Sequence, residues 1–243
     1  YSENFMLPLS HDEVVHGKGT ILNKMWGSYE DKFAQVRNLY AYQFAHPGKK
    51  LNFMGNELGS FDEWNENKSI PWELKKFPKH DSVSRLFRDL NLIYQNHKAM
   101  YFEEYNQAHF QWIMADNAEQ SVLVFKREVP GETMIFVFNM TPRFYSEYDI
   151  GVPYEGEYEE ILNTDKDVYG GWNQYNGANI FTHGSGLQNQ PYRITIKLAS
   201  FAGIFLRYIP KIKEEEKPVI EQKAEPIKQA SAKKTTRKRA SKK

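Results

Sequence analysis

The sequence predicts an α/β segment followed by an all-β domain and a disordered basic tail. Two amphipathic helical patterns flank a short strand-like run in the first hundred residues, and short strand patterns follow from residue 110. The last 33 residues contain no aromatic side chain and two prolines, so they cannot bury enough apolar surface to offset their ordering entropy. We therefore expect three parts, at residues 1–105, 106–209 and 210–243.

The first helix is predicted from its cap and its periodicity. Ser28, with Asp31 three residues later, is typical of a helix start, and the His46-Pro47-Gly48 sequence ends the pattern. Apolar residues recur at helical spacing on one face between these limits: Phe33, Val36, Leu39, Tyr40 and Phe44.

A short strand over residues 50–54 is expected next, closed by Gly55 and followed by a polar loop over residues 55–80. The second helix is expected to begin at Asp81 or Ser82. One helix, one strand and one helix cannot close a sheet or a barrel, so we expect an upstream part to be missing. Four apolar side chains would then have nothing to cover them: Phe33, Leu39, Leu86 and Leu90.

Six short strands are predicted beyond residue 105, and their close spacing favours an all-β sandwich. The Val129-Pro130-Gly131-Glu132 sequence predicts a hairpin turn between two of them. Residues 165–191 form a long loop of a length that is usually functional or mobile. The strands are expected at 110–114, 121–128, 133–138, 157–162, 192–198 and 201–208.

Composition and charge exclude several classes of function. The chain has no cysteine, which removes disulfides and thiolate chemistry, and no apolar run approaches the roughly 20 residues that cross a bilayer. It starts at Tyr1 without a signal-peptide pattern, so we expect a cytoplasmic protein. The net charge of +1 hides an acidic body, residues 1–210, with 20 Lys and Arg against 26 Asp and Glu. The tail lacks aromatics among its lysines, so we expect a solvated extension and not a nucleic-acid partner.

Residues 7–18 concentrate polar chemistry directly after an apolar, strand-like run that ends at Leu9. Two histidines, two carboxylates and a lysine fall within eight positions, where the carboxyl end of a barrel strand would carry reactive groups. A zinc helix is not expected because Asp12, not His, precedes Glu13, and a phosphate loop is not expected because Gly19 follows Lys18. For Glu13 and His16, a solvated loop is as well supported as a functional role. We expect neither a metal nor a cofactor.

The chain resembles the carboxyl-terminal part of bacterial 1,4-α-glucan (glycogen) branching enzymes of the α-amylase superfamily, over roughly residues 1–209. The resemblance lies in long segments and not in the His-Asp pair alone. These are LPLSHDEVVHGK, HPGKKLNFMGNELGSFDEWNENKSIPWEL, RDLNLIY and IGVPYEGEYEEILNTDKDVYGG.

The resemblance implies the last part of a (β/α)8 TIM barrel, then an all-β sandwich. It implies cleavage of an α-1,4 bond in a glucan and transfer to a 6-hydroxyl with retention, which needs two closely spaced carboxyl groups that lie upstream of this chain. His11 and Asp12 would hold hydroxyls of the sugar at the cleavage point, with Asp12 stabilising the transition state. The second-tier substrate contacts are Glu57, Trp64 and Trp72.

For each tryptophan, packing under its own loop is at least as well supported as sugar stacking. Trp112, Tyr169 and Trp172 are interpreted as core residues or loop anchors, with Tyr169 and Trp172 as further candidate glucan contacts. Two alternatives remain open: an amylase-type or debranching hydrolase of the same superfamily, and a non-catalytic glucan-binding or interaction module. Even as part of a branching enzyme, the 243-residue chain alone is expected to be inactive and poorly stable, because it lacks the strands that would cover its helices. The missing amino-terminal part of the same enzyme would be its partner.

Overall fold

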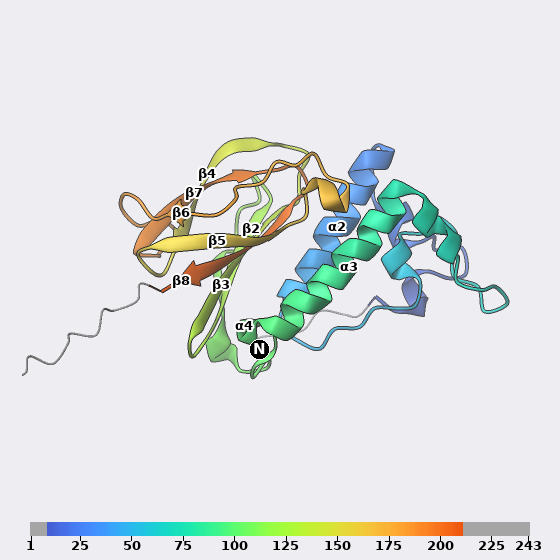
Figure 1. Cartoon of the computed structure of the whole chain (residues 1–243), viewed down its shortest axis with the longest axis horizontal. Coiled ribbons are helices and arrows are strands. Elements are labelled where there is room, and N and C mark those ends of the chain that lie inside the picture. The colour runs from blue at the N-terminus through green and yellow to red at the C-terminus, as the bar shows by residue number, and fades with distance from the viewer. Residues whose placement is uncertain (1–8, 211–243) are drawn as a thin grey trace, which may run out of the picture. The chain divides into compact units, whose positions relative to one another are not determined.

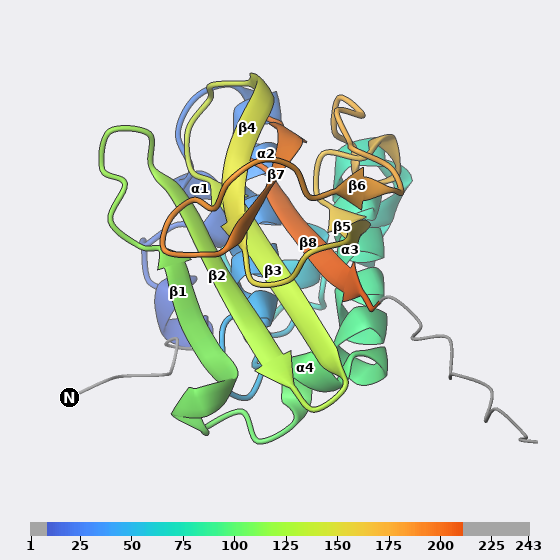
Figure 2. The same cartoon turned by 90° about the vertical axis from the view of Figure 1, so that its left-hand side faces the viewer.

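The computed structural model describes residues 9–210. The predicted disordered tail therefore lies outside the described residues, apart from Pro210, as does the apolar run that precedes Leu9. Figures 1 and 2 show the described part as helices packed beside β-strands.

The predicted first helix is confirmed as α2 (Tyr29–Ala45), capped by Ser28. The Ser28 hydroxyl accepts a hydrogen bond from the Asp31 amide at 3.1 Å, and the Asp31 carboxylate accepts one from the Ser28 amide at 3.0 Å. This reciprocal arrangement satisfies two backbone donors that the helix itself leaves free. Helix α1 (Ile21–Lys24) precedes it, and Thr20 caps that short helix.

The second long helix, α3 (Pro78–Asn96), begins earlier than the sequence predicted. Asp81 and Ser82 were the wrong start, because Pro78 occupies the first helical position, where its fixed φ suits the helix and its missing N–H is not needed. Asp81 lies within the first turn and pairs with Arg85 one turn later, at 2.5 Å. Helix α4 (Lys98–Tyr101) follows directly.

From the sequence we expect four apolar side chains of the helices to be uncovered, and this is wrong for three of them. Phe33, Leu86 and Leu90 are fully buried, and Leu39 is partly buried. Helices α2 and α3 lie side by side and contact each other, and α2 also contacts the β domain (Figure 1). The Tyr42 ring of α2, for example, lies 5.0 Å from the Phe138 ring of the sheet. The other helix and the loop before it supply much of this cover, since the Phe33 ring lies 5.1 Å from the His80 ring of α3 and 6.2 Å from the Phe61 ring.

The β domain is a sandwich of two antiparallel sheets, as predicted. The larger sheet has the order β1-β2-β3-β8-β5-β6, and β4 pairs with β7 in a second sheet. Two strands were missed in the sequence, β4 and β6. The strands are β1 (Phe110–Met114), β2 (Val122–Val129), β3 (Glu132–Asn139), β4 (Tyr145–Val152), β5 (Glu157–Asn163), β6 (Ile180–Phe181), β7 (Tyr192–Leu198) and β8 (Gly203–Ile209).

The larger sheet is buried on both faces, and β3 shows why. Phe136 and Phe138 belong to the core shared with the helices, whereas Ile135 and Val137 belong to the core shared with β4 and β7. Alternate residues of a strand point to opposite faces, so one strand serves both layers. Figure 2 shows β4 and β7 on one side of the larger sheet and the helices on the other.

The predicted hairpin is confirmed between β2 and β3. Val129 pairs with Glu132, which leaves Pro130 and Gly131 as a two-residue loop. Gly131 has φ +91°, a conformation that glycine adopts without steric cost.

The predicted strand over residues 50–54 does not form as a strand. The structure has one isolated bridge there, in which Asn52 pairs in parallel with Leu9. The polar loop that follows contains two short 3₁₀ helices, η2 (Asn56–Leu58) and η3 (Trp72–Lys76). Across the described residues, no helix combines the length and apolar character that crossing a bilayer requires.

Candidate functional site

The turn after Leu9 is built around a short 3₁₀ helix, η1 (His11–Glu13), with Ser10 as its cap. The Glu13 carboxylate accepts hydrogen bonds from the amide and the hydroxyl of Ser10. Glu13 therefore closes the turn and is not directed at a ligand.

His11 and Asp12 project from this turn into solvent. Their side chains are 58% and 68% exposed, and His11 Nε2 lies 3.2 Å from Asp12 Oδ1. The His11 ring also lies 6.1 Å from the ring of Phe53. Both predicted residues are therefore accessible, and the partner that orients His11 is its own neighbour.

The parallel pair of Leu9 and Asn52 places a second polar segment beside the first. The chain leaves both residues in the same direction, so His11 and Asp12 follow one of them while Asn56 and Glu57 follow the other. The Asn52 side-chain amide donates a hydrogen bond to the Glu57 carboxylate at 2.9 Å.

The two predicted tryptophans differ in their surroundings. Trp64 is partly buried, and its ring meets the edge of the Phe53 ring at 5.3 Å, so His11, Phe53 and Trp64 form a row of ring contacts. Trp64 therefore packs against Phe53, which comes just before its own loop. Trp72 lies on η3 and is 56% exposed.

Glu63 fastens the two loops together, a role that the sequence did not reveal. Its carboxylate accepts hydrogen bonds from the amides of Gly17, at 3.0 Å, and Gly19, at 2.5 Å. These two hydrogen bonds are the main reason why the pKa of Glu63 is lowered. The Trp64 amide adds a backbone hydrogen bond to the Val14 carbonyl at 3.1 Å. The only available signal was the pair of glycines, which allow the backbone to turn with positive φ.

His16 and Lys18 belong to the fastened loop. His16 is exposed and has φ +59°, and the Lys18 amine donates to the Asp12 carbonyl at 2.7 Å. Lys18 therefore stabilises the turn that carries Asp12.

A pocket of about 290 Å³ lies beside these loops, but it does not gather the predicted residues. Of the five, only Trp64 lines it, next to Glu63 and Asn56. The Asn56 amide nitrogen is buried there without a hydrogen-bond partner. Among residues 9–210, no group of three His, Asp or Glu side chains converges to hold a metal ion.

The three aromatic residues that the sequence analysis named in the β domain differ in their burial. Trp112 packs on Phe125, with ring centroids 5.3 Å apart, and Tyr169 is buried with its hydroxyl bonded to Asp89 at 2.8 Å. Tyr169 is an anchor, as predicted, whereas Trp112 packs on the sheet but remains 37% exposed. Trp172 is 74% exposed, and its interpretation as a core residue or anchor is wrong.

Comparison with known proteins first identifies the class of the β domain. Residues 112–209 match the family model described as the alpha amylase C-terminal all-beta domain. Among solved structures, AmyP E221Q in complex with maltotriose is similar with a TM-score of 0.52 and 12% identity, over 74% of this chain and 36% of that one. A debranching enzyme from Nostoc punctiforme has the same TM-score at 13% identity, over 79% and 34%. These likenesses show a shared fold.

The relatives found by sequence belong to a narrower group of proteins than the structural neighbours do. The chain is 46% identical to "1,4-alpha-glucan branching enzyme GlgB 1" of Clostridium perfringens strain 13, over 92% of this chain and 34% of the relative. It is 42% identical to "1,4-alpha-glucan branching enzyme GlgB" of Bacillus subtilis strain 168, over 87% and 34%. The resemblance to bacterial branching enzymes is confirmed. The chain spans about a third of the length of these curated relatives.

Proposed function

We propose that this chain is part of a 1,4-α-glucan branching enzyme, and that the enzyme's substrate is an α-1,4-glucan. The observation that carries the proposal is the 42–46% identity to branching enzymes, which extends over about nine tenths of the chain. We also propose that the enzyme works in the cytoplasm, since a chain without cysteine needs no oxidising compartment.

The α/β segment is proposed to be the last part of a (β/α)8 barrel. In such a barrel, reactive residues follow the carboxyl ends of adjacent parallel strands. The parallel pair of Leu9 and Asn52, each followed by polar residues, supports this placement. His11 and Asp12 would then face the substrate from one strand end, and Glu57 from the next.

Asp12 is proposed to stabilise the transition state of glycosyl transfer. An ionised carboxylate accepts strong hydrogen bonds from two neighbouring sugar hydroxyls, and these bonds strengthen as positive charge develops on the ring. His11, which lies 3.2 Å from Asp12, would donate to the next hydroxyl. The nucleophile and the general acid of a retaining reaction are two further carboxyl groups, which we assign to the remaining part of the enzyme.

A chimera tests the proposal. This chain would replace the matching third of the Bacillus subtilis relative, and branching of amylose would be followed by the loss of iodine staining without release of reducing ends. We expect the chimera to branch, Asp12→Asn to lower its rate by at least about 100-fold, and the 243-residue chain alone to be inactive. The control is Asp116→Asn, an exposed aspartate of the β domain, which should leave the rate unchanged.

Three results would contradict the proposal. Near-normal branching by the Asp12→Asn chimera would show that Asp12 does not stabilise the transition state. An inactive wild-type chimera would contradict the assignment of branching activity. Release of reducing ends in step with the loss of staining would instead favour a hydrolase of the same superfamily.

A further inference from the structure

Trp172 is the most exposed of the large apolar side chains among the described residues, at 74%. It lies in the segment between β5 and β6, and the proposed site around His11 and Asp12 does not use it. An exposed tryptophan on a mobile loop would need no explanation. The backbone that carries Trp172, however, is held by buried carboxylates on both sides.

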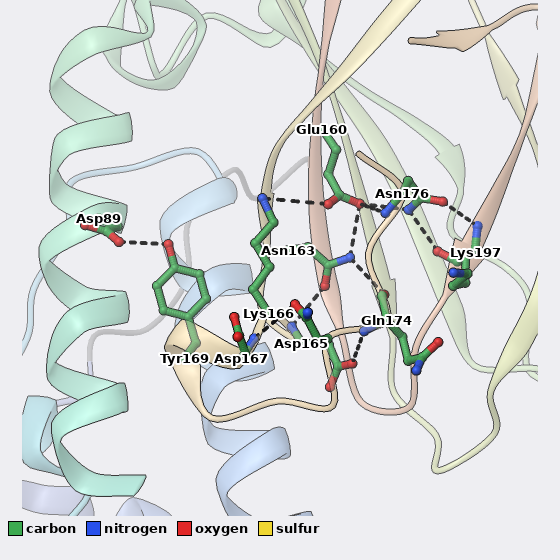
Figure 3. Close-up of polar contacts among 11 residues, drawn as sticks. Asp89, Glu160, Asn163, Asp165, Lys166, Asp167, Tyr169, Gln174, Asn176 and Lys197 are labelled. Atoms are coloured by element: carbon green, nitrogen blue, oxygen red, sulfur yellow. Dashed lines mark hydrogen bonds and ion pairs between the residues drawn. The ribbon is translucent and has the colours of Figure 1, made fainter. Parts of the chain in front are cut away.

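Asp165 holds the backbone on either side of Trp172. Its side chain is almost fully buried, and its two oxygens accept hydrogen bonds from the amides of Trp172, at 3.1 Å, and Gln174, at 3.0 Å. The Asp165 carbonyl accepts a third from the Asn173 amide, at 2.7 Å. Figure 3 shows the Asp165 carboxylate directed at the turn that Gln174 closes. Burying a carboxylate is costly unless its hydrogen bonds are satisfied, so this turn has one well-defined conformation.

The approach to Trp172 is fixed as well. A Cβ atom on Gly171 would lie 2.2 Å from the Asp165 carbonyl oxygen, so only glycine fits there. The Gly170 carbonyl accepts a hydrogen bond from Lys79 of α3 at 2.7 Å, and the Tyr169 hydroxyl reaches Asp89 of the same helix (Figure 3). The segment is thereby attached to a long helix just before Trp172.

Glu160 secures the other end of the turn. Its buried carboxylate accepts hydrogen bonds from the Asn176 side-chain amide, at 2.7 Å, and from the Asn176 backbone amide, at 3.2 Å. The Asn176 side-chain oxygen in turn accepts one from the Lys197 amide of β7, at 2.6 Å (Figure 3). Tyr175 lies between these fixed points and is 43% exposed, with the Lys166 amine 5.5 Å from its ring centroid.

We propose that Trp172 is the stacking platform of a glucan-binding site on the β domain, with Tyr175 and the polar groups of the same turn as further contacts. The choice of ligand rests on the proposed function. An indole ring is flat and apolar, and it matches the C–H face of a pyranose ring. A rigid turn binds without first losing its own conformational freedom, which strengthens a weak contact.

The surroundings support an uncharged sugar as the ligand. Hydrogen-bonding side chains flank the indole on the same turn, namely Asn173 and Gln174. Residues 1–210 carry 20 Lys and Arg against 26 Asp and Glu, so this body repels a polyanion such as nucleic acid. A neutral glucan is not subject to that repulsion.

Affinity electrophoresis of the full 243-residue chain in gels that contain amylopectin tests the site. We expect the wild-type chain to be retarded and Trp172→Ala to bind about tenfold more weakly, as the loss of one aromatic contact implies. Trp172→Phe should keep part of the affinity, because it retains a ring. The matched control is Trp26→Ala, which removes a tryptophan that is 64% exposed on the helical segment and should change nothing. Urea unfolding should show that these exposed substitutions leave the fold intact.

The site is wrong if the wild-type chain is not retarded, or if Trp172→Ala is retarded like the wild type. It is also wrong if Trp172→Ala abolishes only a self-association that sedimentation detects, because Trp172 would then face a second copy of this chain. The branching chimera separates this proposal from the proposed function. If the chimera branches normally but the Trp172→Ala chain binds glucan as the wild type does, only the proposed Trp172 site is wrong. If the chimera is inactive but glucan binding by the chain depends on Trp172, only the branching assignment is wrong.

Discussion

In two loops of this chain, a carboxylate accepts hydrogen bonds from backbone amides, but one carboxylate is partly exposed and the other is buried. Near the proposed catalytic residues, the partly exposed Glu63 carboxylate accepts the amides of Gly17 and Gly19. In the β domain, the buried Asp165 carboxylate accepts the amides of Trp172 and Gln174. The Asp165 side chain is buried, so water competes less for its hydrogen bonds than for those of the partly exposed Glu63. We therefore expect the loop next to His11 and Asp12 to open more readily than the turn that carries Trp172.

The largest expected effect comes from breaking the buried link. Asp165→Ala removes a buried carboxylate that is the acceptor of two amides, and we expect it to lower the free energy of unfolding by about 3 kcal/mol. Urea unfolding measures this. Asp167→Ala is the control, because Asp167 is exposed and its side chain accepts a hydrogen bond from the neighbouring Val168 amide; the substitution should cost about 0.5 kcal/mol or less. Equal losses in the two variants would show that burial does not distinguish these links.

A smaller, pH-dependent effect is expected at Glu160. Burial is the main cause that raises the pKa of Glu160 above its ordinary value of 4.5. A raised pKa means that the folded state binds the proton more tightly, so the stability contributed by this group is complete below pH 4.5 and is lost as the pH rises through the folded pKa. Glu160→Gln cannot titrate, and it should therefore gain stability relative to the wild type as the pH rises from 4.5 toward neutrality.

Urea unfolding of both proteins across this pH range is the measurement. Glu159→Gln on the same strand is the control, because the Glu159 side chain is 38% exposed and pairs with Arg207 at 2.6 Å. A difference between wild type and Glu160→Gln that stays constant with pH would contradict the buried-charge interpretation.

The smallest effect on global stability is expected at the exposed link. Glu63→Ala should leave the unfolding midpoint nearly unchanged, while hydrogen exchange of the Gly17 and Gly19 amides accelerates at least about tenfold. The same measurement on the Trp172 and Gln174 amides serves as the internal reference and should not change. If the Glu63 variant unfolds much earlier than the wild type, the loop is as rigid as the turn in the β domain.

Local signals predicted the elements that local chemistry specifies. Ser28 and Asp31 cap α2 through contacts that span three residues, and Pro130-Gly131 turns the β2–β3 hairpin within two. The β-strand β4 escaped prediction because its exposed first half, with Ser146 and Glu147, hides the alternation. Its buried second half is specified by pairing with β7, where Ile150 lies opposite Ile194.

For the candidate sites, too, the sequence revealed some features and the structure revealed others. A dense polar cluster after an apolar run drew attention to residues 7–18, and the resemblance to branching enzymes pointed to His11 and Asp12 within it. The sequence was also enough to note Trp172. It did not show that Glu63 binds residues 44 and 46 positions away, or that Tyr169 is buried against Asp89, 80 positions away. Partners at such separations leave no pattern in a single sequence.

By itself, then, the sequence determined the two long helices, six of the strands and the β2–β3 turn, since caps, periodicity and turn residues act within a few positions. It also determined the resemblance to branching enzymes, because long segments retain their order of residues. Only the tertiary structure decided which carboxylates are buried, which aromatic side chain stays exposed, and that Phe33 and Leu86 are buried. Burial depends on what packs against a residue from elsewhere in the chain. A carboxylate in water can exchange its hydrogen-bond partners, whereas a buried carboxylate keeps them because water competes less for them.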